Sequence, residues 1–163
     1  MPAKSFKKAR IPSSKGLRNK LWGLCSQYIR SRDKGVCFTC KRTGFEGSGY
    51  HAGHFIPKST CGINLRYDER NIHGQCYHCN INLGGFGAAY HKNMIEKYGK
   101  PFVDKLWKEY TSGHGQKGWT TQDYLNKIAY YEKKGGKLKK PKYITVTEGD
   151  DLNTSLNYSE HCE

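Results

Sequence analysis

The sequence predicts a small α+β domain, and three features support that fold class. The chain has 163 residues, which suffices for one domain with a modest core and not for two. Only 36% of the residues are hydrophobic and 19 are glycine, so many turns and a stabilising staple are expected. Short strand-like segments alternate with longer segments of helical periodicity. The order of these segments gives the elements that follow.

The first predicted element is a helix that begins at Ser13 or Ser14, either of which can cap it, and extends to about Arg32. Gly35 is expected to end this helix. Residues 1–14 are predicted to form a flexible basic arm. Apolar residues recur along one face of the helix at Leu17, Leu21, Leu24 and Tyr28.

Two short strands are predicted next, at Tyr50–Ile56 and Asn71–Gln75. The stretch Lys58–Asp68 between them is expected to be a loop. A short helical turn follows at Cys79–Leu83, and the glycine pair at 84–85 should break it.

Three further helices are expected in the second half of the chain. The first two cover Phe86–Tyr98 and Pro101–Tyr110. A third runs from Thr120 to about Lys134, because Thr-x-x-Asp at its start resembles a capping box. Residues 135–163 are predicted to be a linker and a mobile acidic tail, with a strand at Tyr143–Thr147.

Charge is distributed unevenly along the chain. The formal net charge is +14 and the mean hydropathy is −0.85. Residues 1–44 carry 12 basic and one acidic side chain, whereas residues 45–90 carry three of each. A neutral centre with basic flanks favours a compact site beside surfaces that hold a polyanion, nucleic acid first. The alternative is a basic surface that only keeps the protein solvated.

Four of the seven cysteines form two Cys-x-x-Cys pairs, which begin at Cys37 and Cys76 and end at Cys40 and Cys79. A two-residue spacer lets both sulfurs of one turn face the same ion, and Zn²⁺ prefers four tetrahedral thiolates. In a reducing compartment the pattern favours a metal site over disulfides. A structural Zn²⁺ is therefore predicted, with coincidence or a redox pair as alternatives. Free thiols are expected at Cys25, Cys61 and Cys162.

The segment between the cysteine pairs contains histidine and asparagine residues whose order suggests a catalytic site. It reads His-Ala-Gly-His-Phe-Ile-Pro at 51–57, then Asn71, then Cys-Tyr-His-Cys-Asn at 76–80. This pattern resembles the HNH (His-Me finger, ββα-metal) nuclease motif set between treble-clef zinc knuckles. The resemblance implies that His54 is the general base and that Asn71 braces the loop positioning it. It also implies that Asn80 binds the catalytic metal ion.

Most HNH proteins have histidine where Asn80 stands, but Cys-x-x-Cys-Asn resembles the phage endonuclease VII group, which resolves branched DNA. A longer pattern resembles the NinG/Rap family of phage recombination proteins over roughly residues 35–110. The implied fold is a small zinc-stapled ββα-metal core with flanking helices, over residues 15–134. The matching stretches are His-Ala-Gly-His-Phe, Leu-Arg-Tyr-Asp-Glu-Arg-Asn-Ile-His-Gly-Gln-Cys, and Cys-Asn followed by Gly84-Gly85 and Ala89-Tyr90.

One position departs from the nuclease pattern. Gly53 stands where many HNH enzymes have an aspartate ligand immediately before the base. His51 is the expected substitute and would bind the ion together with Asn80. Oxygen ligands suit Mg²⁺ and an imidazole shifts the preference toward Mn²⁺, so either ion is expected. His54, with a reference pKa of about 6.5, can accept a proton near neutral pH.

Several of these residues also have plain structural interpretations. His54 can be a structural histidine, His51 and His73 can orient a neighbour by hydrogen bonding, and Asn80 can cap a helix. Basic residues on the flanks are expected to hold DNA phosphates without reading sequence. They are Lys7, Lys8, Arg10, Arg18, Arg66 and Arg70.

The predicted function is metal-dependent cleavage of DNA, with a Holliday junction or D-loop as the substrate implied by the resemblance. A homodimer is expected, because resolving a junction takes two symmetric cuts. The alternative is a zinc-binding module that holds DNA or RNA without cutting it. No run of about 18 apolar residues occurs, which predicts a soluble protein without a membrane partner. The resemblance implies the cytoplasm of an infected bacterium.

Overall fold

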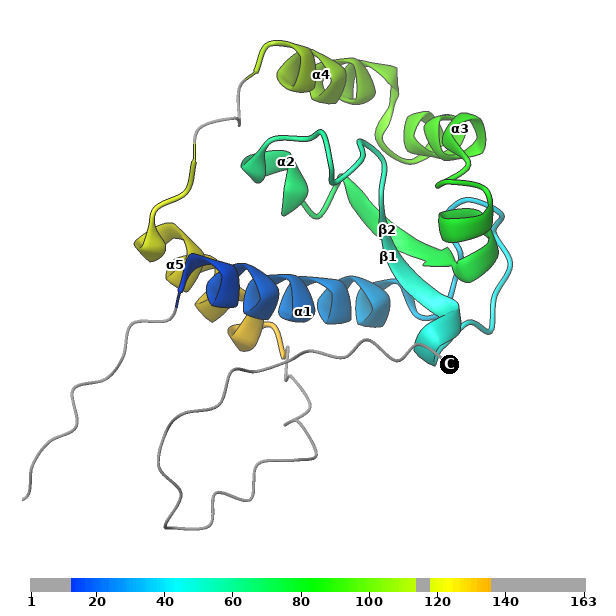
Figure 1. Cartoon of the computed structure of the whole chain (residues 1–163). Coiled ribbons are helices and arrows are strands. Elements are labelled where there is room, and N and C mark those ends of the chain that lie inside the picture. The colour runs from blue at the N-terminus through cyan, green and yellow to red at the C-terminus, as the bar shows by residue number, and fades with distance from the viewer. Residues whose placement is uncertain (1–12, 114–117, 136–163) are drawn as a thin grey trace, which may run out of the picture.

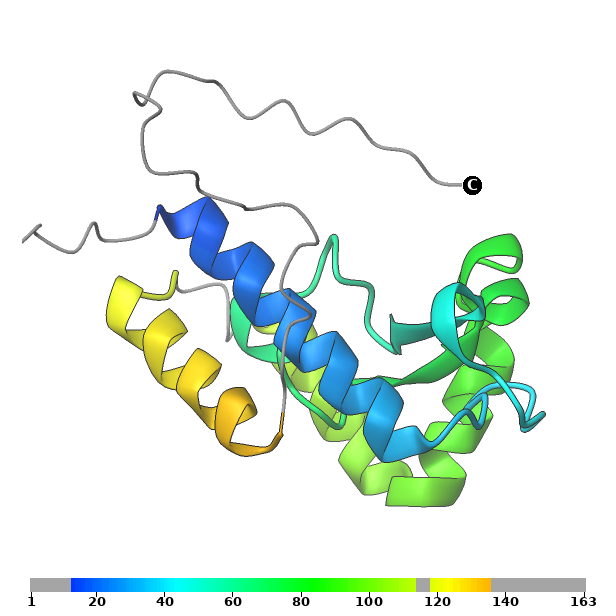
Figure 2. The ribbon, with the colours of Figure 1, turned by 90° about the horizontal axis from the view of Figure 1, so that it is seen from below.

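A hairpin of two short strands separates the helices into two groups in the computed structural model, which describes residues 13–113 and 118–135 (Figure 1). Helices α1 (Ser14–Asp33) and α5 (Thr121–Lys133) lie on one side of the hairpin and pack side by side (Figure 2). On the other side lie α2 (Ile63–Arg66), α3 (Gly87–Tyr98) and α4 (Lys100–Thr111). Each group has its own hydrophobic core.

Helix α1 confirms the predicted amphipathic pattern with one change. Leu17, Leu21 and Leu24 are buried and pack toward α5, and Cys25 and Ile29 are buried as well, whereas Tyr28 is only half-buried. The helix ends at Asp33 because the following residue, Lys34, adopts the left-handed conformation with φ 50°.

Strands β1 (Tyr50–His54) and β2 (Ile72–Cys76) pair antiparallel. β1 is two residues shorter than the predicted Tyr50–Ile56. The strand ends early because the amide of Ile56 donates to the Oδ1 atom of Asn71 at 2.8 Å instead of to a strand partner.

The free edge of β2 is covered by the end of α1 and by the loop that carries Cys37 and Cys40, called the first cysteine loop here. Arg32 donates to the carbonyl of Ile72 at 2.8 Å, and the amide of Gly74 donates to Asp33 at 2.6 Å. The amide of Phe38 donates to the carbonyl of Gly74 at 2.7 Å. A two-stranded sheet is marginal alone, and these contacts satisfy its second strand on both sides.

The remaining elements follow the predicted order with shifted bounds. α2 lies inside the stretch predicted as a loop, and the predicted turn at Cys79–Leu83 is a π-helix, η2 (His78–Asn82). The capping box of α5 is confirmed, with reciprocal hydrogen bonds between Thr120 and Asp123.

Parts of the prediction fall outside the described residues: the arm at 1–12, the strand at Tyr143–Thr147, and the thiol of Cys162. In the part of the chain that is described, no helix combines the length and apolar character needed to cross a membrane.

Candidate active site

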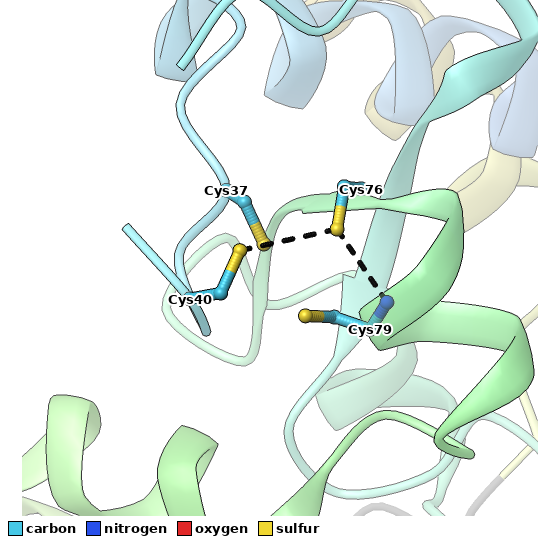
Figure 3. A group of neighbouring side chains, drawn as sticks. All are labelled: Cys37, Cys40, Cys76 and Cys79. Atoms are coloured by element: carbon cyan, nitrogen blue, oxygen red, sulfur yellow. Dashed lines mark hydrogen bonds between the residues drawn. The ribbon is translucent and has the colours of Figure 1, made fainter. Parts of the chain in front are cut away.

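Four cysteine sulfurs gather where the first cysteine loop meets the end of β2 (Figure 3). The Sγ atoms of Cys37, Cys40, Cys76 and Cys79 all lie within 4.8 Å of one another, and those of Cys40 and Cys76 are 4.0 Å apart. Four thiolates at a Zn–S distance of about 2.3 Å place sulfurs at close to this spacing. Three of the four residues are buried. Within residues 13–113 and 118–135 this is the group of side chains suited to a structural zinc ion.

A buried asparagine ties the first cysteine loop to the rest of the molecule. Asn93 on α3 donates its Nδ2 hydrogens to the carbonyls of Phe38 and Thr39, at 2.7 and 2.9 Å. The phenyl ring of Phe38 stacks on His73 of β2, with centroids 3.9 Å apart. The cysteine cluster is therefore fixed to both β2 and α3, and with it the start of η2.

A cleft of about 490 Å³ opens beside this cluster. β1 lines it with residues 51–54, η2 with Asn80 and Ile81, and α1 with Trp22, Ser26 and Arg30. Three of the residues expected to take part in catalysis thus share one cleft: His51, His54 and Asn80.

The ring of His54 is held in one tautomer. Its Nε2 atom lies 2.9 Å from the carbonyl oxygen of Arg66, which can only accept, so Nε2 carries the proton and Nδ1 keeps a lone pair. The ring stacks on Trp22 with centroids 5.1 Å apart. Burial lowers the pKa of His54 to about 4; the hydrogen bond to Arg66 opposes the shift, and the positive charges of Lys58 and Arg66 add to it.

Asn71 holds the segment that follows His54. It is fully buried, its Oδ1 accepts from the amide of Ile56, and its Nδ2 donates to the carbonyls of Ile56 and Leu65 at 3.2 and 2.9 Å. These bonds fix residues 55–66, which include the carbonyl that orients the His54 ring. The contacts fit the bracing role that the resemblance implied.

A second chain of hydrogen bonds orients Asn80. The Nε2 atom of His51 lies 2.9 Å from the carbonyl oxygen of Ser48, so His51 also carries its proton on Nε2. Its Nδ1 must then accept, and the Nδ2 atom of Asn80 lies 2.9 Å away as the donor. The amide oxygen of Asn80 consequently points the other way, toward Gly53.

Gln75, which the sequence analysis did not single out, lies directly beside the cleft residues Gly53 and Asn80. It is fully buried, and its Nε2 donates to Thr39 and to the carbonyl of Gly85, whereas its Oε1 atom is buried without a hydrogen-bond partner. A Cβ atom added at Gly53 would overlap that oxygen and would lie 2.8 Å from the Oδ1 atom of Asn80. The signal available in the sequence was a polar residue on the same strand as His73, without any motif to single it out.

His73 has the orienting role left open from the sequence. It is fully buried, with Nδ1 2.9 Å from the hydroxyl of Tyr90 and Nε2 2.9 Å from the hydroxyl of Tyr98. Tyr90 in turn donates to the carbonyl of Gly53 at 3.1 Å. This chain anchors the backbone of β1 between His51 and His54.

A second cleft, of about 240 Å³, adjoins the first and shares Trp22 and Lys58 with it. The basic side chains lining the two clefts are called the basic track here. They are Lys15, Arg18, Arg30, Lys58 and Arg66.

Arg18 and Arg66 were expected to bind phosphate, and both belong to the basic track. Arg70, with the same expected role, lines neither of the two clefts; it pairs with Asp68 at 2.7 Å and lies over the ring of Phe102. Lys7, Lys8 and Arg10 lie outside the described residues.

A family model described as "Bacteriophage Lambda NinG protein" matches residues 3–141 of the chain. Among curated proteins, the chain is similar to "Protein ninG" of Salmonella phage P22, with 34% identity over 108 residues. It is similarly related to "Protein ninG" of Escherichia phage 933W and of Escherichia phage lambda, each with 32% identity over 108 residues. Each alignment covers 66% of this chain and 50% of the relative, so the chain spans about half the length of these relatives. No solved structure matches it.

Proposed function

Because the chain belongs to the NinG family of phage proteins, we propose that it is a metal-dependent DNA endonuclease that acts on branched recombination intermediates. The family description names no activity, so the proposal depends on the site. Its main support is that His54 presents one free ring nitrogen in the same cleft as Asn80, beside a cysteine cluster suited to structural zinc.

His54 has the properties of a general base. Its Nε2 proton is engaged by the carbonyl of Arg66, which leaves Nδ1 as the atom that takes a proton from water. The lowered pKa keeps the ring neutral at pH 7, and a neutral ring is required for that step. Stacking on Trp22 fixes the direction of the ring.

The binding site proposed for the divalent cation lies beside Gly53. The buried amide oxygen of Gln75 lacks a hydrogen-bond partner there, and the amide oxygen of Asn80 faces the same point. Because Gly53 has no side chain, the amide oxygen of Gln75 occupies the position that a Cβ atom would take. Oxygen donors of this kind suit Mg²⁺ or Mn²⁺. When bound, the ion would stabilise charge on the scissile phosphate and on the departing oxygen.

The basic track supplies a surface for the DNA backbone. From Arg18 to Arg30, α1 advances about 18 Å at 1.5 Å per residue, which is the length of about five base pairs. No salt bridge to Arg18 or Arg30 occurs in the described part of the chain, so both charges are available to phosphates. Such contacts hold a backbone without reading its sequence, as a structure-specific enzyme requires.

The test is a nicking assay on synthetic Holliday junctions and D-loops with Mg²⁺, with Mn²⁺ or with EDTA. Cleavage is expected with the metal ions and not with EDTA. His54→Ala should lower the rate by about 10²–10⁴-fold, the usual contribution of general acid–base catalysis. His78→Ala is the matched control, because His78 is exposed, lies in η2 and does not line the cleft. It should cleave like the wild type.

The rival function is a zinc-binding module that holds nucleic acid without cutting it. Tight binding to junctions with no metal-dependent cleavage would establish that rival and reject the nuclease. Equal cleavage by His54→Ala and the wild type would reject His54 as the base. Including the corresponding RNA junctions in the assay separates DNA from RNA as the substrate.

A further inference from the structure

We propose that Gln75 and Asn80 supply the two side-chain oxygen ligands of the divalent cation beside His54, and that His51 orients Asn80 instead of binding the ion. The inference rests on the proposed function and names the ligands of that same site. It assigns Gln75 a role that neither the sequence motif nor the family comparison suggests.

The direction of the Gln75 amide is fixed by its partners. Its Nε2 lies 3.0 Å from the carbonyl oxygen of Gly85, which can only accept a hydrogen bond, so the NH₂ group must be at that end. Oε1 therefore points toward Gly53. An unpaired buried amide oxygen is destabilising relative to a paired one. A cation at this point would supply the missing partner.

The direction of the Asn80 amide follows from the same reasoning. The carbonyl of Ser48 fixes the tautomer of His51, and the lone pair on His51 Nδ1 requires the NH₂ group of Asn80 opposite it. Both ring nitrogens of His51 are thus engaged. What Asn80 offers to the cleft is its oxygen, which lies 2.8 Å from the Cβ position of Gly53 that Gln75 Oε1 occupies, so the two amide oxygens are neighbours.

Gly53 makes this convergence feasible. It is buried, and a Cβ there would meet both amide oxygens. An aspartate at this position would bring its own carboxylate and displace Gln75. The proposed ligand Gln75 therefore lies on β2, the strand that pairs with the β1 strand of Gly53 and His54.

The charges around the site predict how strongly it binds. Both proposed ligands are neutral amides, and the nearest cleft charges are the basic side chains of Arg30 and Lys58. Cation affinity falls as the number of anionic ligands falls. The site should bind Mn²⁺ weakly alone, and a carboxylate at position 75 should strengthen binding.

The experiment is a titration of the zinc-loaded full chain with Mn²⁺, followed by electron paramagnetic resonance of the free ion and without DNA. Gln75→Leu should weaken Mn²⁺ binding by at least about tenfold, the lower end of the loss caused by removing even an outer partner of a metal ligand. Gln75→Glu should strengthen it by at least about tenfold, because it adds a charge to the ligand set.

Gln27→Glu is the matched control. Gln27 also has a buried, unpartnered Oε1, but it lies on α1, lines a neighbouring cleft, and is not among the atoms around Gly53. A carboxylate there adds the same charge and should leave Mn²⁺ binding unchanged. Zinc content and the thermal midpoint of each variant report on folding. If Gln75→Leu fails to fold, the gain expected for Gln75→Glu decides the question.

His51 is tested by the echo modulation of bound Mn²⁺. The spectrum should contain no imidazole nitrogen coupling. A coupling that disappears in His51→Ala would overturn the assignment, as would Mn²⁺ affinities unchanged by both Gln75 variants, or no Mn²⁺ site in the wild type. Cleavage is measured separately on the same samples. Cleavage with unaltered metal binding in the Gln75 variants rejects only the ligand assignment, whereas Gln75-dependent metal binding without cleavage rejects only the nuclease.

Discussion

Two backbone carbonyls set the protonation of the two histidines in the cleft. The carbonyl of Arg66 takes the Nε2 proton of His54, and that of Ser48 takes the Nε2 proton of His51. The two rings then differ in what their Nδ1 atoms meet. For His51 it is the amide of Asn80. The Nδ1 atom of His54 is left to the cleft. His51 therefore orients Asn80, whereas His54 can accept a proton.

The lowered pKa of His54 also predicts how folding stability depends on pH. The unfolded histidine has a pKa of about 6.5 and the folded one about 4, so the unfolded state binds more protons between these values. The stability contributed by the neutral, buried His54 is fully present above about pH 6.5 and is lost as the pH falls toward 4. The positive charges of Lys58 and Arg66 lower the pKa of His54 further and so add to this effect.

His54→Gln should remove that dependence. In urea unfolding without added Mg²⁺ or Mn²⁺, the stability of the wild type should fall by about 1 kcal/mol more than that of the variant between pH 7 and 5.5. Measurement above pH 5.5 limits zinc loss from protonated thiolates. An identical pH dependence in the two proteins would contradict the burial of a neutral His54.

At the scale of elements, the sequence predicted the helices better than the segments around the site. Helix α1 was predicted from the helical spacing of Leu17, Leu21 and Leu24. The prediction is confirmed, because these same side chains are buried in the core shared with α5. β1 is shorter than predicted because the side chain of Asn71 takes the hydrogen bond of Ile56. Such a contact joins residues 15 apart in the chain, and no local pattern encodes it.

In the candidate site, too, contacts between residues far apart in the chain could not be predicted from local sequence patterns. The spacing of the four cysteines predicted a cluster that the fold does assemble. The contact of the Gln75 side chain with Gly53 depends instead on the strand register, which places Gln75 opposite His51, and on the direction of one amide group, which is set by the carbonyl of Gly85. Neither is visible before the two strands are brought together.

The cysteine cluster joins the loop of Cys37 and Cys40 to the end of β2 and to η2, so its loss should be severe. Binding of structural zinc contributes about 10–16 kcal/mol in small zinc domains, comparable with or above the whole stability of a typical domain. Cys76→Ser should therefore lower the zinc content below the roughly one ion per chain expected of the wild type, and the protein should unfold cooperatively at a lower temperature.

Cys61→Ser is the control for that experiment, because Cys61 is buried but lies outside the cluster. Its zinc content should match the wild type by metal analysis. A metal-free protein that keeps its thermal transition would show that the fold does not depend on zinc.

At the scale of the whole molecule, the positions of the basic residues predict that DNA binds to one face of the protein. The basic track follows one face of α1 and continues through Lys58 and Arg66 across both clefts. Arg70 lies away from it, with its charge compensated by Asp68. A phosphate backbone laid along the track would pass the ring of His54, which places binding and the proposed chemistry on the same face.

Arg18→Gln should therefore weaken junction binding and reduce the slope of log K against log salt by about one, since each phosphate contact contributes about 0.9. Arg70→Gln removes the same charge from a residue already paired with a carboxylate, and its slope should stay near that of the wild type. The measurement is fluorescence anisotropy of a labelled junction at several salt concentrations, in buffer without added Mg²⁺ or Mn²⁺ so that no cleavage intervenes and the zinc stays bound. Because net charge changes equally in both variants, a general attraction between a basic protein and DNA would lower both slopes alike. Equal losses would thus contradict a localised track, whereas a loss confined to Arg18 would place the DNA over α1.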